Sequence, residues 1–100
     1  MPELTPDALR AAVAQLLPSR LPEFSRHLSE AATNAQKKQS LAPLRMFVHS
    51  WAVTISIERH PERAARLHEL ERAINTGEAG REAATEIRLI WEAAEAEAGL

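Results

Sequence analysis

The sequence predicts a small all-α protein, a single-domain bundle of four to five helices. Two features of composition favour helix: the chain contains 3 Gly, and alanine, the strongest helix former, is frequent. Apolar side chains also recur at intervals of three and four residues, which is the period of an amphipathic helix. A chain of 100 residues can bury one hydrophobic core. We therefore expect residues 1–100 to form a single helical domain.

The first predicted helix covers residues 6–17. Thr5 is a suitable N-cap, and Pro6 suits the first helical position, where a missing N–H has no consequence. Pro18 ends the helix because a proline disfavours the α conformation in the residue before it. The second predicted helix covers residues 21–38 and ends in two lysines, whose charges complement the helix dipole.

The third predicted helix, residues 41–59, is the most apolar segment and should be the central one. Trp51 lies in its middle and is expected in the core. Residues 53–57 read Val-Thr-Ile-Ser-Ile, which also fits a short strand because apolar and polar β-branched or small residues alternate. No second segment of this kind is available for pairing, so we favour helix.

Two further helices are predicted over residues 61–75 and 79–98. Residues 75–77, Asn-Thr-Gly, supply a stop signal for the first of them. Three glutamates crowd the C-terminal end of the second, where the helix dipole is negative, so we expect its last turn to fray. These glutamates are Glu92, Glu95 and Glu97.

The side chains that carry chemistry form no recognisable catalytic pattern. The chain has no Cys, and it contains no glycine-rich phosphate-binding loop. His68-Glu69 begins like a zinc-binding helix motif, but Arg72 stands where the second histidine is required. Glu23 and His27 share a helix face and are read as a surface pair. We therefore predict a protein without enzymatic activity, cofactor or metal ion.

Charge and hydropathy limit the partners further. The net charge is −2, with six Lys/Arg against four Asp/Glu in residues 1–50 and six against ten in residues 51–100. Nucleic-acid binding is not favoured, because it usually requires a basic surface. No signal peptide and no apolar segment long enough to span a bilayer is evident, so we expect a cytoplasmic protein without membrane contact.

Part of the sequence carries a family resemblance. The residues concerned are Phe24, Leu28, Ala31, Leu41-Ala42-Pro43-Leu44, Val48 and Trp51. With these, residues 20–51 resemble a family of small uncharacterised actinobacterial proteins whose genes often accompany those of mRNA-cleaving toxins. The resemblance implies an antitoxin-like or accessory role.

The function we predict is a protein-interaction module that binds a partner protein or forms a homo-oligomer such as a dimer. The helix over residues 79–98 could dock on a partner through Ile87, Ile90 and Trp91, because an amphipathic helix presents such anchors on one face. A helical nucleic-acid-binding domain is the alternative, given the arginines within residues 59–66. An enzyme or a small-ligand binder is a third reading.

Overall fold

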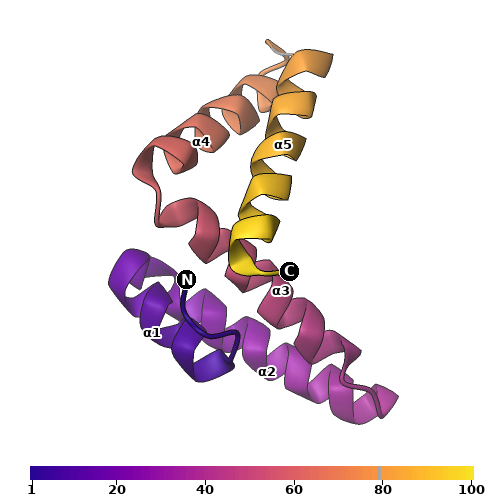
Figure 1. Ribbon diagram of the computed structural model, residues 1–100. Helices are drawn as coiled ribbons and strands as arrows, with labels where there is room; N and C mark the ends of the chain where they lie inside the picture. The colour runs from indigo at the N-terminus through magenta and orange to yellow at the C-terminus, as the bar shows by residue number, and fades with distance from the viewer. Residues whose placement is uncertain (79) are drawn as a thin grey trace.

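The structure, a computed structural model, describes residues 1–78 and 80–100. This part of the chain contains five α-helices, one short 3-10 helix and no β-strand (Figure 1). In chain order the elements are α1 (Pro6–Leu16), η1 (Pro18–Arg20), α2 (Leu21–Lys38), α3 (Ala42–Glu58), α4 (Pro61–Asn75) and α5 (Arg81–Ala98). The predicted all-α fold is confirmed. Residues 53–57 are helical, so the strand alternative is wrong.

The two ends of α1 show how local chemistry sets a boundary. Thr5 caps the helix, and its side-chain hydroxyl accepts a hydrogen bond from the Ala8 N–H at 3.2 Å. At the other end the prediction was one residue too long. Leu17 leaves the helical conformation (φ −139°, ψ 59°), and the 3-10 turn η1 begins at Pro18.

The ends of α3 and α5 also differ slightly from the predicted ranges. The predicted range 41–59 shortens by one residue at each end, since Leu41 and Arg59 are the cap residues of α3. The predicted start of the last helix, Ala79, lies outside the described residues. The structure describes α5 from Arg81 onward.

Both α2 and α4 end on a residue with left-handed backbone. After α4, Gly77 has φ 76°, and the next N–H donates to the Ala73 carbonyl at 2.9 Å. This is the predicted glycine stop. After α2 the same role falls to Gln39, with φ 49°, and the next N–H donates to the Ala35 carbonyl at 3.1 Å. These bonds satisfy carbonyls that the helix ends leave free.

A first core lies between α1, α2 and α3, and the end of α5 contributes Ala98 to it. Phe24 is fully buried and meets Phe47 and Trp51 edge to face, with ring centroids 5.0 and 5.1 Å apart. Trp51 is 3% exposed, so its predicted core position is confirmed. The buried residues of this first core are Leu9, Val13, Phe24, Ala31, Phe47, Trp51, Ala52, Ile55 and Ala98.

A second core lies between the C-terminal half of α3, α4 and α5. Its buried residues are Val53, Ile57, Ala64, Leu67 and Ala94. Both cores therefore use α3, from opposite sides of the helix. This explains why the third segment is apolar almost all round and why it is the central helix, as predicted.

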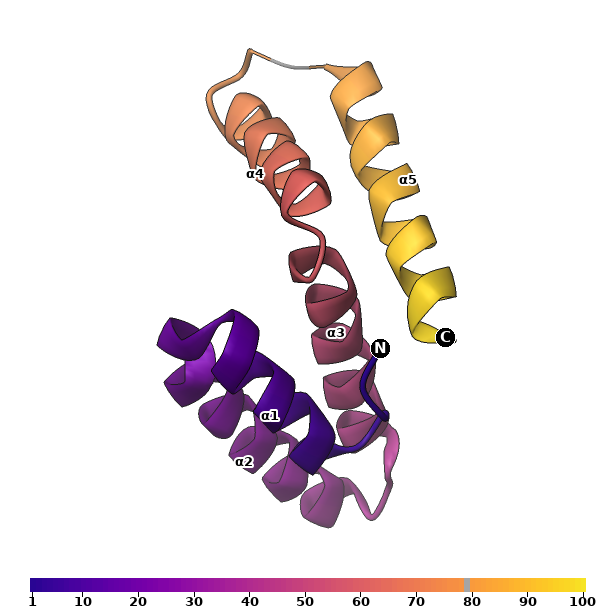
Figure 2. The ribbon, with the colours of Figure 1, turned by 60° about the vertical axis from the view of Figure 1, so that its left-hand side comes forward.

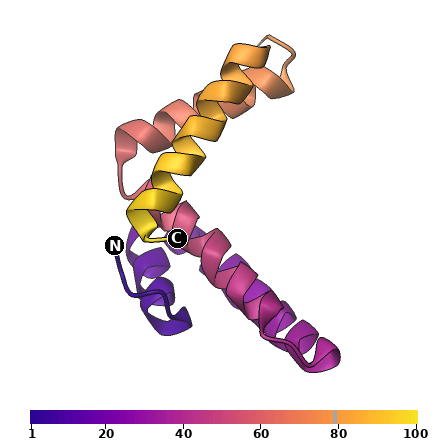
Figure 3. The same ribbon diagram turned by 45° about the vertical axis from the view of Figure 1, so that its right-hand side comes forward.

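The molecule is elongated because the two helix pairs diverge from α3. In Figures 2 and 3, α1 and α2 lie along one part of α3, whereas α4 and α5 lie against its C-terminal part. The extents are 42 × 28 × 25 Å, and the radius of gyration is 14.8 Å, against about 13 Å for a compact chain of this length. Within the described residues, every helix is too short or too polar to span a bilayer.

Candidate functional site

The three predicted interface residues on α5 have different surroundings. Ile87 and Ile90 are partly buried and pack against the second core. Trp91 lies on the edge of that face and is 38% exposed. Of the three, Trp91 presents the most surface to a partner, and its interface role stays a prediction.

One face of α3 is covered along only half of its length. Val53 and Ile57 are buried in the second core, beneath α4 and α5. The same face continues toward the N-terminus through Ser50 and Met46, because intervals of three and four residues keep side chains on one side of a helix. Ser50 is exposed, and Met46 is 70% exposed. An apolar face that starts in the core thus runs out into solvent.

The exposed half of this face forms one wall of a groove between α2 and α3, called here the α2–α3 groove. It is open to solvent and has a volume of about 340 Å³. Apolar side chains form its floor, namely Ala31, Phe47 and Trp51. Its rim carries His27, Glu30, Asn34 and Lys38 from α2, and Met46 and Ser50 from α3. Such a surface can accept an apolar side chain and orient its neighbours by charge.

The part of the molecule around this groove extends beyond α1. α1 has 11 residues and α2 has 18, which correspond to lengths of about 16 and 27 Å. α1 ends at η1 and α2 begins there. The last turns of α2 therefore extend past the first turn of α1 (Figure 2). We call residues 30–47 the arm. Its tip carries Leu41, which is 60% exposed.

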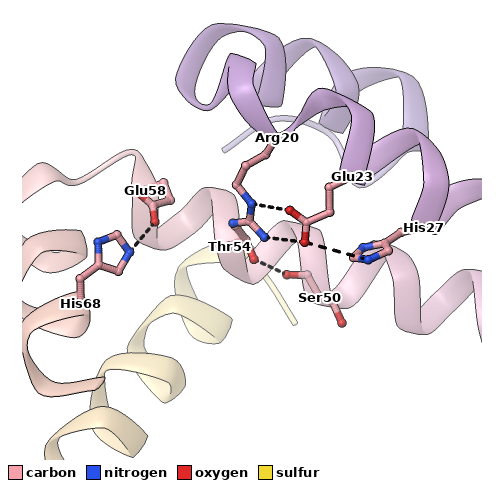
Figure 4. Close-up of polar contacts among 7 residues, drawn as sticks. All are labelled: Arg20, Glu23, His27, Ser50, Thr54, Glu58 and His68. Carbon is pink, nitrogen blue, oxygen red and sulfur yellow. Dashed lines mark hydrogen bonds and ion pairs between the residues drawn. The ribbon is translucent and has the colours of Figure 1, made fainter. Parts of the chain in front are cut away.

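A row of polar side chains begins at η1 and the first turns of α2 (Figure 4). Arg20 donates from Nε and an NH2 group to the Glu23 carboxylate at 2.9 and 3.2 Å, and this hydrogen bonding lowers the pKa of Glu23. The Arg20 guanidinium also lies 4.9 Å from the Trp51 ring centroid, a cation–π distance. His27 Nε2 lies 4.0 Å from Glu23, which confirms the predicted surface pair.

The row continues along α3 to α4 (Figure 4). The Thr54 hydroxyl donates to the Ser50 carbonyl at 3.0 Å, and His68 Nε2 lies 3.0 Å from a Glu58 carboxylate oxygen. Across residues 1–78 and 80–100, no three His, Asp or Glu side chains converge as metal ligands would. On this surface Glu23 contacts both Arg20 and His27, and Glu58 pairs with His68.

A separate ionic cluster holds the end of α5. The Glu97 carboxylate contacts His60 Nε2 at 2.6 Å, Arg63 NH1 at 2.7 Å and Arg59 Nε at 3.6 Å. The hydrogen bonds from His60 and Arg63 lower the pKa of Glu97 to about 2. We call these four residues the Glu97 cluster. It ties the last turn of α5 to the junction of α3 and α4.

The Glu97 cluster bears on the predicted fraying of the last turn of α5, because it places cations beside that turn. The helix continues to Ala98, and Gly99 closes it with φ 81°. The sequence did not indicate this, because the partners of Glu97 lie 34 and more residues earlier in the chain. Arg66 gives a similar result: it pairs with Glu86 of α5 at 2.7 Å. Cations that only the tertiary fold supplies therefore lie beside two glutamates of α5.

Together, these observations define an all-α protein in which two cores share one helix and an arm carries a groove with an apolar floor. The chain belongs to a family of unknown function (DUF6247), whose model matches residues 1–98. The match extends well beyond residues 20–51, on which the sequence resemblance rested. No curated protein and no solved structure matches the chain.

Proposed function

We propose that this protein is a non-enzymatic interaction module that binds a protein partner in the α2–α3 groove. The observation that carries this proposal is the exposed continuation of the α3 core face, where Met46 is 70% exposed beside an apolar floor. Apolar patches with a polar rim are typical of protein-binding surfaces. Methionine suits such a surface, because its flexible thioether adapts to the shape of a ligand.

The groove favours an α-helical ligand. It lies between two packed helices, and a third helix placed along them can insert side chains at i, i+3, i+4 and i+7. Glu30 and Lys38 at its rim carry opposite charges and can fix the direction of that helix. The resemblance of residues 20–51 to proteins encoded beside toxin genes makes a small mRNA-cleaving toxin a candidate partner.

Nucleic-acid binding is the second candidate function, and one observation favours it. The arm, residues 30–47, carries three Lys/Arg and one Glu, so it is basic although the chain is acidic overall. A protein that binds the phosphate backbone loses affinity steeply as the salt concentration rises. Met46 and the apolar floor argue against this reading, because they offer a phosphate neither a positive charge nor a hydrogen-bond donor.

The test is cross-linking from inside the groove. A photoreactive amino acid replaces Met46 in the full chain, and a matched variant carries it at Leu89, which is 54% exposed on α5. After irradiation in living cells, we expect a discrete protein adduct from position 46 and none from position 89. An adduct to nucleic acid from position 46, or equal labelling from both positions, contradicts the proposal.

A further inference from the structure

We infer that the ligand of the α2–α3 groove is α5 of a second copy of this chain, so that the protein forms a two-fold symmetric dimer. This inference rests on the proposed function, since it names the partner of the same groove. Three observations carry it: the composition of the outer face of α5, the spacing of charges on the two surfaces, and the area that a single chain exposes.

The outer face of α5 has the composition of a groove ligand. Trp91 is 38% exposed, and Arg88 and Glu95 share its side of the helix, because they lie three residues before it and four after it. Arg88 and Glu92 pair at 3.1 Å, but their side chains remain 63% and 56% exposed. An aromatic anchor with flanking charges is typical of the residues that dominate binding energy.

The charges on the two surfaces have matching spacing. Glu30 and Lys38 lie eight residues apart on α2, which is about 12 Å along the helix. Arg88 and Glu95 lie seven residues apart on α5, which is about 10.5 Å. If α5 of the second copy runs in the direction of α2, its Arg88 meets Glu30. Its Glu95 then meets Lys38, and its Trp91 lies between them over the apolar floor.

The exposed area of a single chain also points to an assembly. A compact monomer of 11.1 kDa exposes about 5,700 Å², whereas this chain exposes 6495 Å². The excess is about 800 Å², which is the area that each partner contributes to a standard protein–protein interface. The elongated shape is the reason for the excess, because the arm and α5 diverge from α3.

A second copy satisfies both surfaces at once. Each chain carries one groove and one outer α5 face, so a two-fold axis makes the contact twice and leaves neither surface exposed. The opposite charges of the two halves favour this arrangement, since the basic arm of one copy meets the acidic C-terminal region of the other. A ligand that occupied only the α2–α3 groove would leave the outer face of α5 exposed.

The test exchanges charges without changing the net charge of either variant. The arm variant carries Glu30→Lys and Lys38→Glu, and the helix variant carries Arg88→Glu and Glu95→Arg. We expect the native chain to have twice the mass of 11.1 kDa by light scattering at high concentration. Each variant alone should dimerise roughly tenfold or more weakly, because like charges then face each other.

Mixing supplies the decisive measurement. In an equimolar mixture of the two variants, every reversed charge on one copy faces a reversed charge on the other, so we expect a heterodimer of native affinity. A chain carrying all four substitutions should dimerise with itself for the same reason. Weakening without recovery in the mixture overturns the docking register, and a monomeric native chain at every concentration overturns the inference.

Two further variants distinguish the loss of the Trp91 anchor from the loss of any exposed apolar side chain on α5. Trp91→Ala should raise the dimer dissociation constant roughly tenfold or more, whereas Leu89→Ala, on the opposite side of α5, should leave it unchanged. Circular dichroism on all variants controls for folding. If the native chain is monomeric while position 46 still cross-links a different protein in cells, the second copy is excluded and the proposed function stands.

Discussion

The two cores of this protein are stabilised in different ways. The first core, around α1 and α2, contains three aromatic rings that meet edge to face, and Phe24 at its centre is fully buried. The second core, around α4 and α5, contains aliphatic side chains only. Ion pairs between α5 and the rest of the chain, at Glu97 and Glu86, accompany that smaller apolar core.

The comparison shows that one helix can serve two cores that differ in strength and in sensitivity to solvent conditions. Burial of aromatic surface involves no titratable group, so it depends little on pH. Exposed and half-exposed ion pairs depend on both pH and salt. We therefore expect the two halves to respond differently to mutation, acid and salt, and the predictions below test this difference.

The largest effect should come from the first core. Phe24→Ala removes a ring that contacts Phe47 and Trp51, and should destabilise the fold by about 3–5 kcal/mol. Leu67→Ala in the second core should have a smaller effect, of about 2–3 kcal/mol. Urea unfolding followed by circular dichroism measures both. An equal or larger loss for Leu67→Ala would show that the two cores do not differ in this way.

A moderate effect should follow from removal of the charge at the end of α5. Glu97→Gln keeps the shape of the side chain but weakens its contacts with His60 and Arg63, and should lower the free energy of unfolding by about 1–2 kcal/mol. Amide hydrogen exchange should become faster in the last turns of α5 and stay unchanged in α1. Uniformly faster exchange in both would contradict a local role.

Acid should weaken the second core through the same residue. The folded-state pKa of Glu97 is about 2, and its ordinary value is 4.5. Its contribution is therefore complete above pH 4.5 and is lost as the pH falls toward 2, because the unfolded chain binds the proton more readily. Unfolding titrations from pH 6 to pH 2 should show a shallower decline for Glu97→Gln than for the native chain. Parallel curves would exclude this role.

The smallest effect concerns a buried hydroxyl between the two cores. Ser56 is fully buried on α3, and its Oγ has no hydrogen-bond partner within the described part of the chain. Ser56→Ala removes this unsatisfied group and should leave stability unchanged or raise it by up to about 1 kcal/mol. Ser50→Ala on the exposed part of α3 is the matched control. A clear loss of stability for Ser56→Ala would indicate a partner for the hydroxyl.

The sequence predicted the helices well, because helix boundaries depend on neighbouring residues. Thr5, Pro18 and Gly77 act on the backbone within one turn, so their chemistry was visible without tertiary structure. Residues 53–57 left a strand open as an alternative to the favoured helix. Their β-branched side chains face two cores on opposite sides of one helix, and two-sided burial resembles alternation in a sequence.

The candidate site could be predicted only in part. The apolar stripe of α5 was found, but periodicity does not show which of its members the second core would bury, so Ile87 and Ile90 could not be separated from Trp91. The α2–α3 groove left no signal of its own. It exists because α1 is shorter than α2 and because α5 ends midway along α3, and both facts concern the packing of distant segments.

The shared helix α3 also fixes the rotational phase of the two halves of the molecule. Each residue of an α-helix turns the chain by about 100°. One residue inserted near Ala52 would therefore rotate the C-terminal part of α3, together with α4 and α5, about the helix axis and turn Ile55 away from the first core. An insertion at Gln39, in the turn before α3, leaves the angle between the two cores about the α3 axis unchanged. We therefore expect the chain to tolerate an inserted or deleted residue least in the middle of α3, which both cores share.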